Sequence, residues 1–300
     1  MPTCLTMSSS KLIPYLEVLF AVVVWGASFI ATKIVLRDVE PITLVWLRFT
    51  IGLVVLAIPV FWRKQFGWPA REDWLYLGLL GFLGITFHQW LQSNGLQTSE
   101  ASTTAWIVAT SPVFMALLGW LLLKESLTLW KSLGIALAAL GVLTVVSHGD
   151  LRSMSIGRLG APGDVLILFS SLNWAVFSAL SRRGLKRYSA SLMIFQVMCF
   201  GWLFTSLLFL SGRHFPEIAL LSRSGWLGVA FLGIFCSGLA YIAWYDALQA
   251  LTTAEAGVFL YIEPLVAVVV ALIVLQEQIT LASLFGGLII LLGVWLVNRN

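Results

Sequence analysis

Glu263 and Pro264 stand side by side at the start of the apolar stretch EPLVAVVVALIVL, where neither residue suits a buried helix. A carboxyl group inside a membrane can carry a proton, contact a substrate or bond to a neighbouring helix. Proline lacks an N–H group, so the carbonyl of Leu260 loses its helical partner. The stretch SPVFMALLGWLLL repeats the proline as Pro112 and has Ser111 in place of the glutamate. We therefore expect a helix kink at both prolines and an ionisable group beside only one.

The sequence HQWLQSN contains the densest group of polar residues within an apolar run. His88 and Gln92 share one face of a helix, and Gln89 lies on the neighbouring face. Polar side chains inside a membrane are costly, which makes these three residues candidates to line a substrate cavity. His88 is also a candidate for proton coupling, together with Glu263, while a neutral histidine bonded to another helix is the alternative.

Aromatic residues offer the apolar counterpart to these polar groups. Tyr241, Trp244 and Tyr245 form one group, and Trp25 and Trp174 each precede a serine by about one helical turn. Stacking surface opposite hydrogen-bonding side chains is typical of a ligand pocket, although helix packing and an aromatic belt at the membrane surface are alternatives. The predicted substrate cavity comprises Trp25, Ser28, His88, Gln89, Gln92, Ser111, Trp174, Ser178, Tyr241, Trp244, Tyr245 and Glu263.

Arg48 lies within the apolar sequence VWLRFTIG, too far from the start of its run to reach the membrane surface easily. A guanidinium in this place needs a partner inside the protein. We expect a structural ion pair, for which Glu263 is one acid that can serve, and binding of a substrate anion is the alternative.

The elements that carry these residues are predicted to be membrane-spanning helices. Of the 300 residues, 59% are hydrophobic and only 11% are charged, well below the charged fraction of a soluble domain. A membrane helix needs roughly 20 apolar residues, and the long continuous runs suit helices and not barrel strands. The predicted helices begin near Leu12, Pro41, Trp74, Ser102, Thr128, Ala161, Ser189, Gly225, Ala254 and Leu281.

The chain contains an internal repeat. A shift of 152 residues aligns residues 74–142 with residues 226–294 without a gap, and a shift of 149 pairs Trp25 with Trp174 and Lys33 with Arg182. Five helices per half is an odd number, so the second half must cross the membrane in the opposite orientation. The predicted fold is therefore all-α, with ten transmembrane helices in two inverted five-helix repeats, residues 1–148 and 161–300, joined by residues 149–160.

The repeated motifs resemble those of the EamA family of the drug/metabolite transporter superfamily. The resemblance rests on SPVFMALLGWLLLKESLT and EPLVAVVVALIVLQEQIT, each followed by a glycine-rich helix, and on WGASF and WLRF near the N-terminus. It covers essentially the whole chain. It implies ten helices around a central cavity and export of small metabolites such as amino acids, or of toxic compounds. The family pattern also places an arginine at Arg48 and often an acid before Pro264, across varied substrates.

Charge and motif content set further expectations. Most loop lysines and arginines, including Arg182, Arg183, Lys186 and Arg187, fall on one side, which predicts that both termini are cytoplasmic in a cell membrane such as the bacterial inner membrane. The net charge of +4 follows from this bias and gives no support for nucleic-acid binding. The three scattered cysteines fit neither a disulfide framework nor a metal site, and the phosphate-binding loop of nucleotide-driven transporters is missing from the sequence. We expect neither a cofactor nor a metal.

The sequence thus predicts a secondary exporter that works as a monomer in the lipid bilayer and moves a small-molecule substrate by alternating access about a midplane cavity. The alternatives are a membrane-embedded enzyme and a receptor or scaffold that transports nothing. An enzyme is disfavoured because no His-Glu-x-x-His or Gly-x-Ser-x-Gly motif occurs.

Overall fold

The structure is a computed structural model that describes residues 12–124, 126, 128–149, 160–251 and 253–299. Cys4, Glu125 and most of the predicted connecting segment, residues 149–160, lie outside these ranges. The described residues form helices and no strands, and nine of the helices are long and apolar enough to cross a membrane. The chain is thus an all-α integral membrane protein, as its composition predicts.

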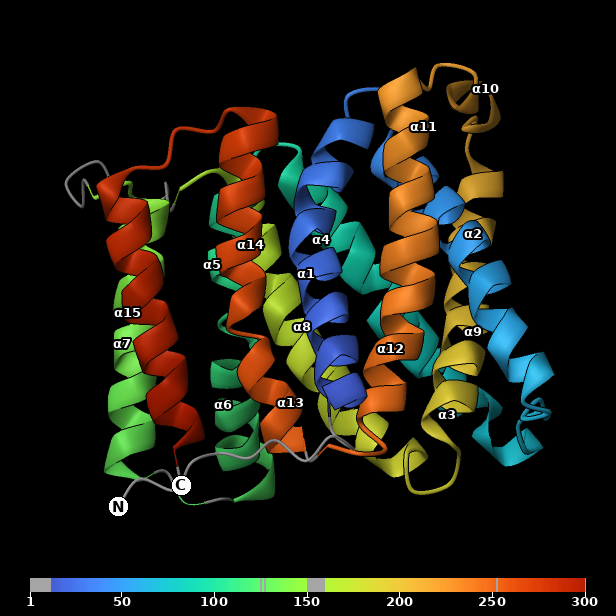
Figure 1. Cartoon of the computed structure of the whole chain (residues 1–300), viewed down its shortest axis with the longest axis horizontal. Helices are drawn as coiled ribbons and strands as arrows, with labels where there is room; N and C mark the ends of the chain where they lie inside the picture. Colours follow the sequence, from blue (N-terminus) through green and yellow to red (C-terminus); the bar gives the residue numbers. More distant parts are fainter. Residues whose placement is uncertain (1–11, 125, 127, 150–159, 252, 300) are drawn as a thin grey trace.

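The first half contains five long helical segments (Figure 1). They are α1 (Leu12–Val35); α2 (Pro41–Trp62); the third helix, made of α3 (Trp74–Gly81), η3 (Phe82–Phe87) and α4 (His88–Leu96); the fourth, made of α5 (Ala101–Val108) and α6 (Ser111–Leu123); and α7 (Leu129–Val146). A short turn, η2 (Arg71–Asp73), precedes α3.

The second half repeats this order. Its segments are α8 (Pro162–Gly184); α9 (Ala190–Ser211); the eighth helix, made of α11 (Arg223–Ala230), η4 (Phe231–Leu239) and α12 (Ala240–Ala247); the ninth, made of α13 (Thr253–Phe259), α14 (Ile262–Val270) and η5 (Ala271–Leu275); and α15 (Leu281–Asn298). The short α10 (Phe215–Ile218) lies in a loop. All ten helices begin within two residues of the predicted positions.

The two halves run in opposite directions. Lys33, at the end of α1, donates to the carbonyl of Ser99 at 2.7 Å, while the Ser99 hydroxyl donates to Asp164, at the start of α8, at 2.6 Å. The end of the first helix in one half therefore lies on the same face of the protein as the start of the first helix in the other half. We call this side the Lys33 face, and the opposite side, where α1 begins and α15 ends, the terminal face (Figure 1).

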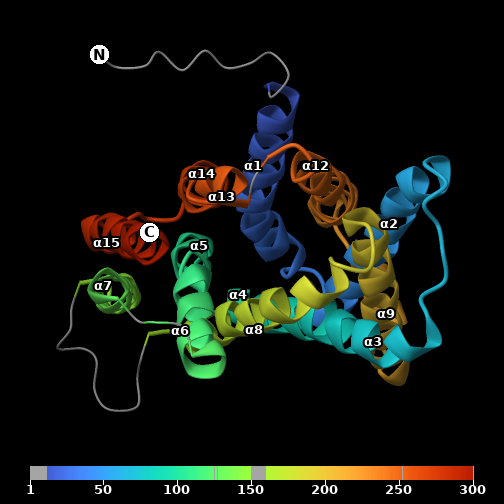
Figure 2. The same cartoon turned by 90° about the horizontal axis from the view of Figure 1, so that it is seen from below.

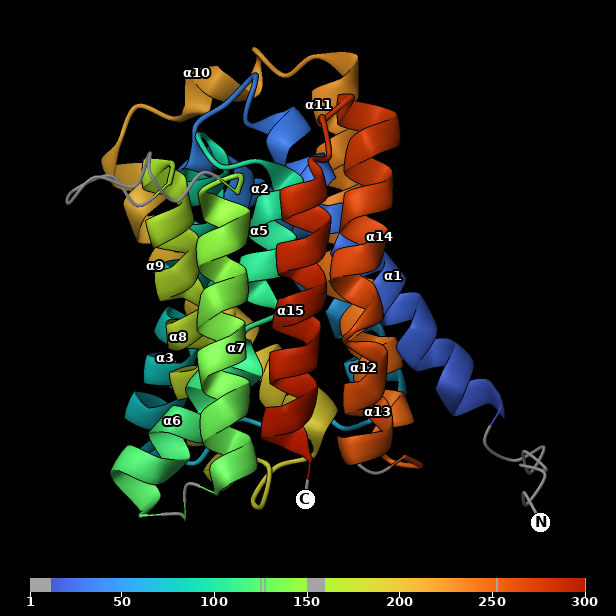
Figure 3. The same ribbon diagram turned by 90° about the vertical axis from the view of Figure 1, so that its left-hand side faces the viewer.

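The halves are joined by reciprocal packing. Helix α1 packs on α12 and α14 of the second half, and α8 packs on α4, α5 and α6 of the first half (Figure 2). Helices α7 and α15 pack along each other at one end of the molecule (Figure 3). In this pair a methyl group on Gly141 would lie 2.7 Å from the carbonyl oxygen of Gly286, so only glycine permits so close an approach.

Large apolar side chains cover the outer surface of the helices. Leu75 is 87% exposed and Ile273 is 65% exposed, and many further leucines, phenylalanines and tryptophans are similarly open. On a water-soluble domain such a surface would be an aggregation hazard, but in a bilayer it contacts lipid tails.

Candidate functional site

The fourth and ninth helices are interrupted at equivalent points. The first break, at Ala109 and Thr110, separates α5 from α6, and the second, at Leu260 and Tyr261, separates α13 from α14. Pro112 and Pro264 each follow within three residues of the break, as expected from their missing N–H groups. Each half thus contains one interruption, at the place where the sequence predicts a kink.

The two breaks differ in how their polar groups are satisfied. The Ser111 hydroxyl donates to the carbonyl of Val108 at 2.7 Å, the carbonyl that Pro112 deprives of an N–H partner. Glu263 stands at the place matching Ser111, and its carboxyl group has no hydrogen-bond or ion-pair partner among the residues that the structure describes. Its backbone oxygen faces Gly26 of α1, where a methyl group would lie only 2.6 Å away. Among the described residues, Glu263 is thus an acid without a partner at the junction of the two halves.

The third and eighth helices widen into π-helix at matching positions. η3 covers residues 82–87 and η4 covers residues 231–239, and the 152-residue shift places the whole of η3 within η4. A π-helical turn carries an extra residue and is frequent at functional sites. The sequence showed no signal for these turns, because they depend on how the helix packs.

Arg48 connects the two widened helices. Its Nε donates to Ser237 Oγ of η4 at 2.7 Å, and its Nη1 donates to Gln89 Oε1 of α4 at 3.0 Å. Its side chain is buried, and its guanidinium lies 5.3 Å from the centre of the Phe49 ring. The expected ion pair is wrong: both hydrogen-bond partners are neutral, and Glu263 is not one of them, because the polar groups closest to Arg48 are supplied by the third and eighth helices.

One aromatic cluster lies where α1 meets α12. The Trp25 ring lies 5.6 Å from Tyr241 and 5.3 Å from Trp244, and Tyr241 stacks on Tyr245 at 6.4 Å. The Trp25 indole N–H donates to the carbonyl of Cys236 at 3.1 Å, next to the serine that binds Arg48. Four of the predicted cavity residues are therefore in one place.

A second cluster lies at the equivalent junction in the other half, between α8 and α4. The rings of Trp174 and His88 are 5.0 Å apart. His88 is buried, and its Nδ1 has no hydrogen-bond partner in the described part of the chain, whereas the main chain of Ser170 bonds to the ring. The matched tryptophans thus make equivalent contacts: Trp25 packs on α12 and Trp174 packs on α4, in each case a helix of the opposite half.

The remaining predicted residues are less well connected. Ser28 is buried in α1, and Gln92 and Ser178 are half-buried, but none of the three has a hydrogen-bond partner among the described residues. Two pockets, of about 390 and 410 Å³, lie elsewhere: one beside Arg63 and Ile242, the other between Lys131 and Arg299. Neither contains any residue of the predicted substrate cavity.

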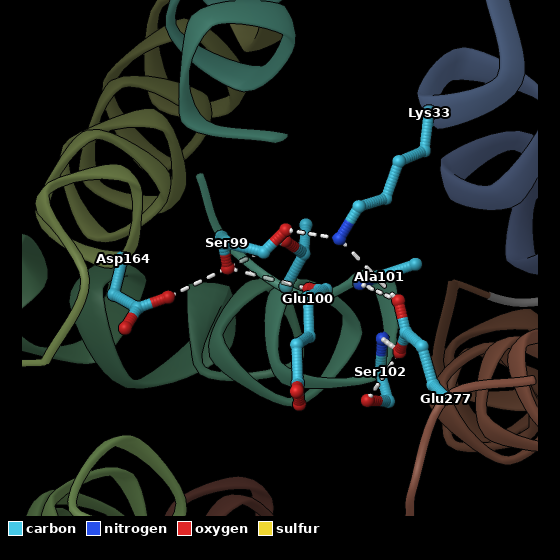
Figure 4. A network of polar contacts seen from close by, with 8 residues as sticks. Lys33, Ser99, Glu100, Ala101, Ser102, Asp164 and Glu277 are labelled. Carbon is cyan, nitrogen blue, oxygen red and sulfur yellow. Dashed lines mark hydrogen bonds and ion pairs between the residues drawn. The ribbon is translucent and has the colours of Figure 1, made fainter. Parts of the chain in front are cut away.

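A polar network that the sequence motifs did not predict lies on the Lys33 face (Figure 4). Glu277 Oε1 accepts from the N–H of Ala101 at 2.8 Å, and its Oε2 accepts from the N–H and hydroxyl of Ser102 at 3.1 and 2.8 Å. Lys33 lies 3.5 Å from the same carboxylate. The sequence feature that could have predicted this network is the Glu-x-x-Thr motif. Its threonines, Thr128 and Thr280, cap α7 and α15.

A second polar group ties two loops on the same face. His214 Nδ1 lies 2.7 Å from Glu217 Oε1, and the other Glu217 oxygen accepts from the Glu40 N–H and the Thr43 hydroxyl. Burial alone would raise the pKa of Glu217, but these hydrogen bonds outweigh it and hold that pKa below its usual value. Glu40, His214 and Glu217 are also the described side chains whose ligand atoms, within 4.8 Å of one another, could hold a metal ion.

The fold and these junctions define a polytopic helical membrane protein built from two inverted repeats. A family model, that of the EamA-like transporter family, matches residues 12–147 and 161–299. The chain belongs to this family, and it is a membrane transporter.

Similar proteins cover nearly the whole chain. An uncharacterized transporter of Archaeoglobus fulgidus is 29% identical over 95% of this chain and 97% of its own length. A probable terminal-alkyne amino-acid exporter of Streptantibioticus cattleyicolor is 27% identical over 93% of this chain and 91% of its own. A solved crystal structure shares the fold, with a TM-score of 0.65 at 21% identity and coverage of 97% and 96%.

Proposed function

We propose that the protein is a secondary exporter of small organic solutes that binds its substrate between the two halves. The observation that carries this proposal is the reciprocal packing of α1 on α12 and α14 and of α8 on α4, α5 and α6. Matched contacts of this kind allow two inverted repeats to exchange conformations, so that a site between them faces each side of the membrane in turn.

The proposed site combines aromatic surface with a few polar groups. Trp25 and Tyr241 supply one wall, and Trp174 and His88 supply the matching wall. Glu263 supplies a carboxyl that has no partner among the described residues. The unpaired His88 Nδ1 and the unpaired carboxyl are groups that a substrate or a proton can satisfy. We propose that Glu263 carries the coupling proton, and that the protein works as a monomer with both termini cytoplasmic.

The relative described as a probable amino-acid exporter gives a first substrate class to test. Purified protein in liposomes should show saturable flux of an amino acid or a related amphipathic metabolite from a panel of solutes. Trp25→Ala and Trp174→Ala should each reduce that flux at least about tenfold, since each removes an aromatic wall of the site. Trp120→Ala should retain flux, because Trp120 is 45% exposed on the outer surface.

The proposal fails if no solute of the panel shows saturable flux, or if the three tryptophan variants behave alike. Catalytic turnover of a solute without its movement across the membrane would instead support the membrane-embedded enzyme.

A further inference from the structure

Glu277 forms a helix cap that crosses from one half of the protein to the other. The first N–H groups of an α-helix have no partner within the helix, and a carboxylate placed there gains from both hydrogen bonding and the helix dipole. Such caps usually come from a neighbouring residue in the chain. Here the cap of α5 comes from Glu277, a residue 176 positions away from Ala101.

This cap is the centre of a tie between helices of both halves (Figure 4). Lys33 links the end of α1 to this cap, because its ammonium group lies close to the Glu277 carboxylate and donates to the Ser99 carbonyl. Ser99 continues the connection to α8 through Asp164, and Thr98 accepts from the N–H of Gly163 at 2.9 Å. Helices α1, α5 and α8 and the segment between η5 and α15 are thus held together on the Lys33 face.

The contacts on the terminal face differ from those on the Lys33 face: the Arg63 guanidinium donates to both carboxylate oxygens of Asp246 at 2.6 Å, and the Tyr15 hydroxyl donates to Glu255 at 3.3 Å. Arg182 is the repeat counterpart of Lys33, and Leu251 is the counterpart of Ser99. Arg182 is exposed and has no hydrogen-bond or ion-pair partner within the described part of the chain. On this face the N-terminal part of α1 diverges from the bundle (Figure 3). Arg182 therefore does not repeat the tie made by Lys33 among the described residues, and other pairs join the two halves on the terminal face.

We propose that the cap of α5 by Glu277, with Lys33, is the gate that closes the Lys33 face, and that it must break before a solute can leave on that side. By the repeat, Arg182 then donates to the Leu251 carbonyl and helps to close the terminal face. This inference rests on the proposed exporter function for its purpose, but the contacts that define the gate do not depend on the substrate.

The gate is tested by labelling a reporter cysteine, Ser28→Cys, in liposomes of known protein orientation. Ser28 is buried in α1, just over one turn before Lys33. A membrane-impermeant thiol reagent is applied from either side, and modification of this cysteine is followed by peptide mass spectrometry. With the gate intact, the reporter should react faster from the terminal face than from the Lys33 face.

Glu277→Gln and Lys33→Ala should each raise labelling from the Lys33 face about tenfold and lower it from the terminal face, since each removes a charged hydrogen bond from the closed state. Glu100→Gln is the matched control: it removes the same charge one residue before α5, and the Glu100 side chain does not cap the helix. It should leave both rates unchanged. Arg182→Ala should shift access the opposite way, toward the terminal face.

A second measurement keeps the test independent of the reporter. Hydrogen exchange of the Ala101 and Ser102 amides should speed up about tenfold in Glu277→Gln and not in Glu100→Gln. The gate is refuted if labelling and exchange are unchanged in folded Glu277→Gln, or if labelling rises equally from both sides. Flux is measured in the protein without the reporter cysteine. The predicted labelling together with no solute flux would support the gate and refute the exporter, whereas solute flux together with unchanged labelling would support the exporter and refute the gate.

Discussion

The carboxylate of Glu277, in the second half of the chain, holds Ser102, in the first half, by two hydrogen bonds of 3.1 and 2.8 Å at the start of α5. The contact gives a physical role to one glutamate of the repeated Glu-x-x-Thr motif, while the threonine caps the following helix. A short motif thus organises two helices, one adjacent in sequence and one across the repeat.

Replacement of Gly26 by alanine should separate α1 from α14. The added methyl group would lie 2.6 Å from the backbone oxygen of Glu263, which cannot move without displacing the helix. We expect a loss of about 1–3 kcal/mol in the free energy of unfolding, as in overpacked interiors, and reduced flux. Thermal unfolding in detergent measures the first effect. Gly257→Ala is the control, because nothing lies within 4 Å of its added methyl, and a loss as large there would contradict the explanation.

Pro112→Ala and Pro264→Ala should change transport more than folding. Each restores an N–H group and allows its helix to close across the break, so the matched weak points of the two halves stiffen. We expect a several-fold lower flux, with folded yield and melting temperature close to those of the parent protein. Unchanged flux at equal protein density in liposomes would show that the breaks serve the architecture alone.

Glu263→Gln separates proton coupling from a structural role. The amide retains the size and hydrogen-bonding capacity of the acid but cannot release a proton. If Glu263 couples transport to protons, flux in the variant should lose its dependence on the pH gradient while exchange of substrate continues. The measurement is uptake into liposomes with and without an imposed gradient. Retention of the full gradient dependence would exclude Glu263 as the coupling residue.

Ser237→Ala should destabilise the protein, because the Arg48 Nε–H would lose its acceptor inside the membrane. A hydrogen bond to a charged group contributes about 1.5–3 kcal/mol, so a loss of that size is expected in denaturant unfolding. Ser211→Ala, whose hydroxyl bonds only to a nearby backbone carbonyl in an exposed place, should change stability by less than about 0.5 kcal/mol. Similar values for the two variants would mean that Arg48 finds another acceptor.

We expect the protein to lose stability in acid as Glu217 becomes protonated. Hydrogen bonds to its charged form hold its pKa below the usual value, so it stabilises the fold above about pH 4.3 and this contribution disappears as the pH falls through the lowered pKa. Glu217→Gln should melt earlier than the parent protein at neutral pH, and the two melting temperatures should converge as the pH falls below the lowered pKa of Glu217. A difference in melting temperature that persists in acid would show that the substitution acts through packing and not through the charge of Glu217.

Much of the architecture follows from the sequence alone. Runs of about 20 apolar residues can satisfy their backbone in lipid only as helices, and an odd number of helices per repeat forces the second half to invert. The helix breaks are equally local: Pro112 and Pro264 lack a donor wherever they are placed, so their effect could be predicted without knowing any neighbour.

Only the tertiary structure decided the contacts. Arg48 binds Ser237 and Gln89, and not an acid, because a side chain finds its partner among whichever helices are packed beside it. The cap of α5 by Glu277 is likewise set by how α5 and the second half meet, as is the lack of a partner for the Glu263 carboxyl among the described residues. A repeat in the sequence shows that two glutamate-bearing motifs are equivalent, but equivalence in sequence cannot say which residues Glu277 binds.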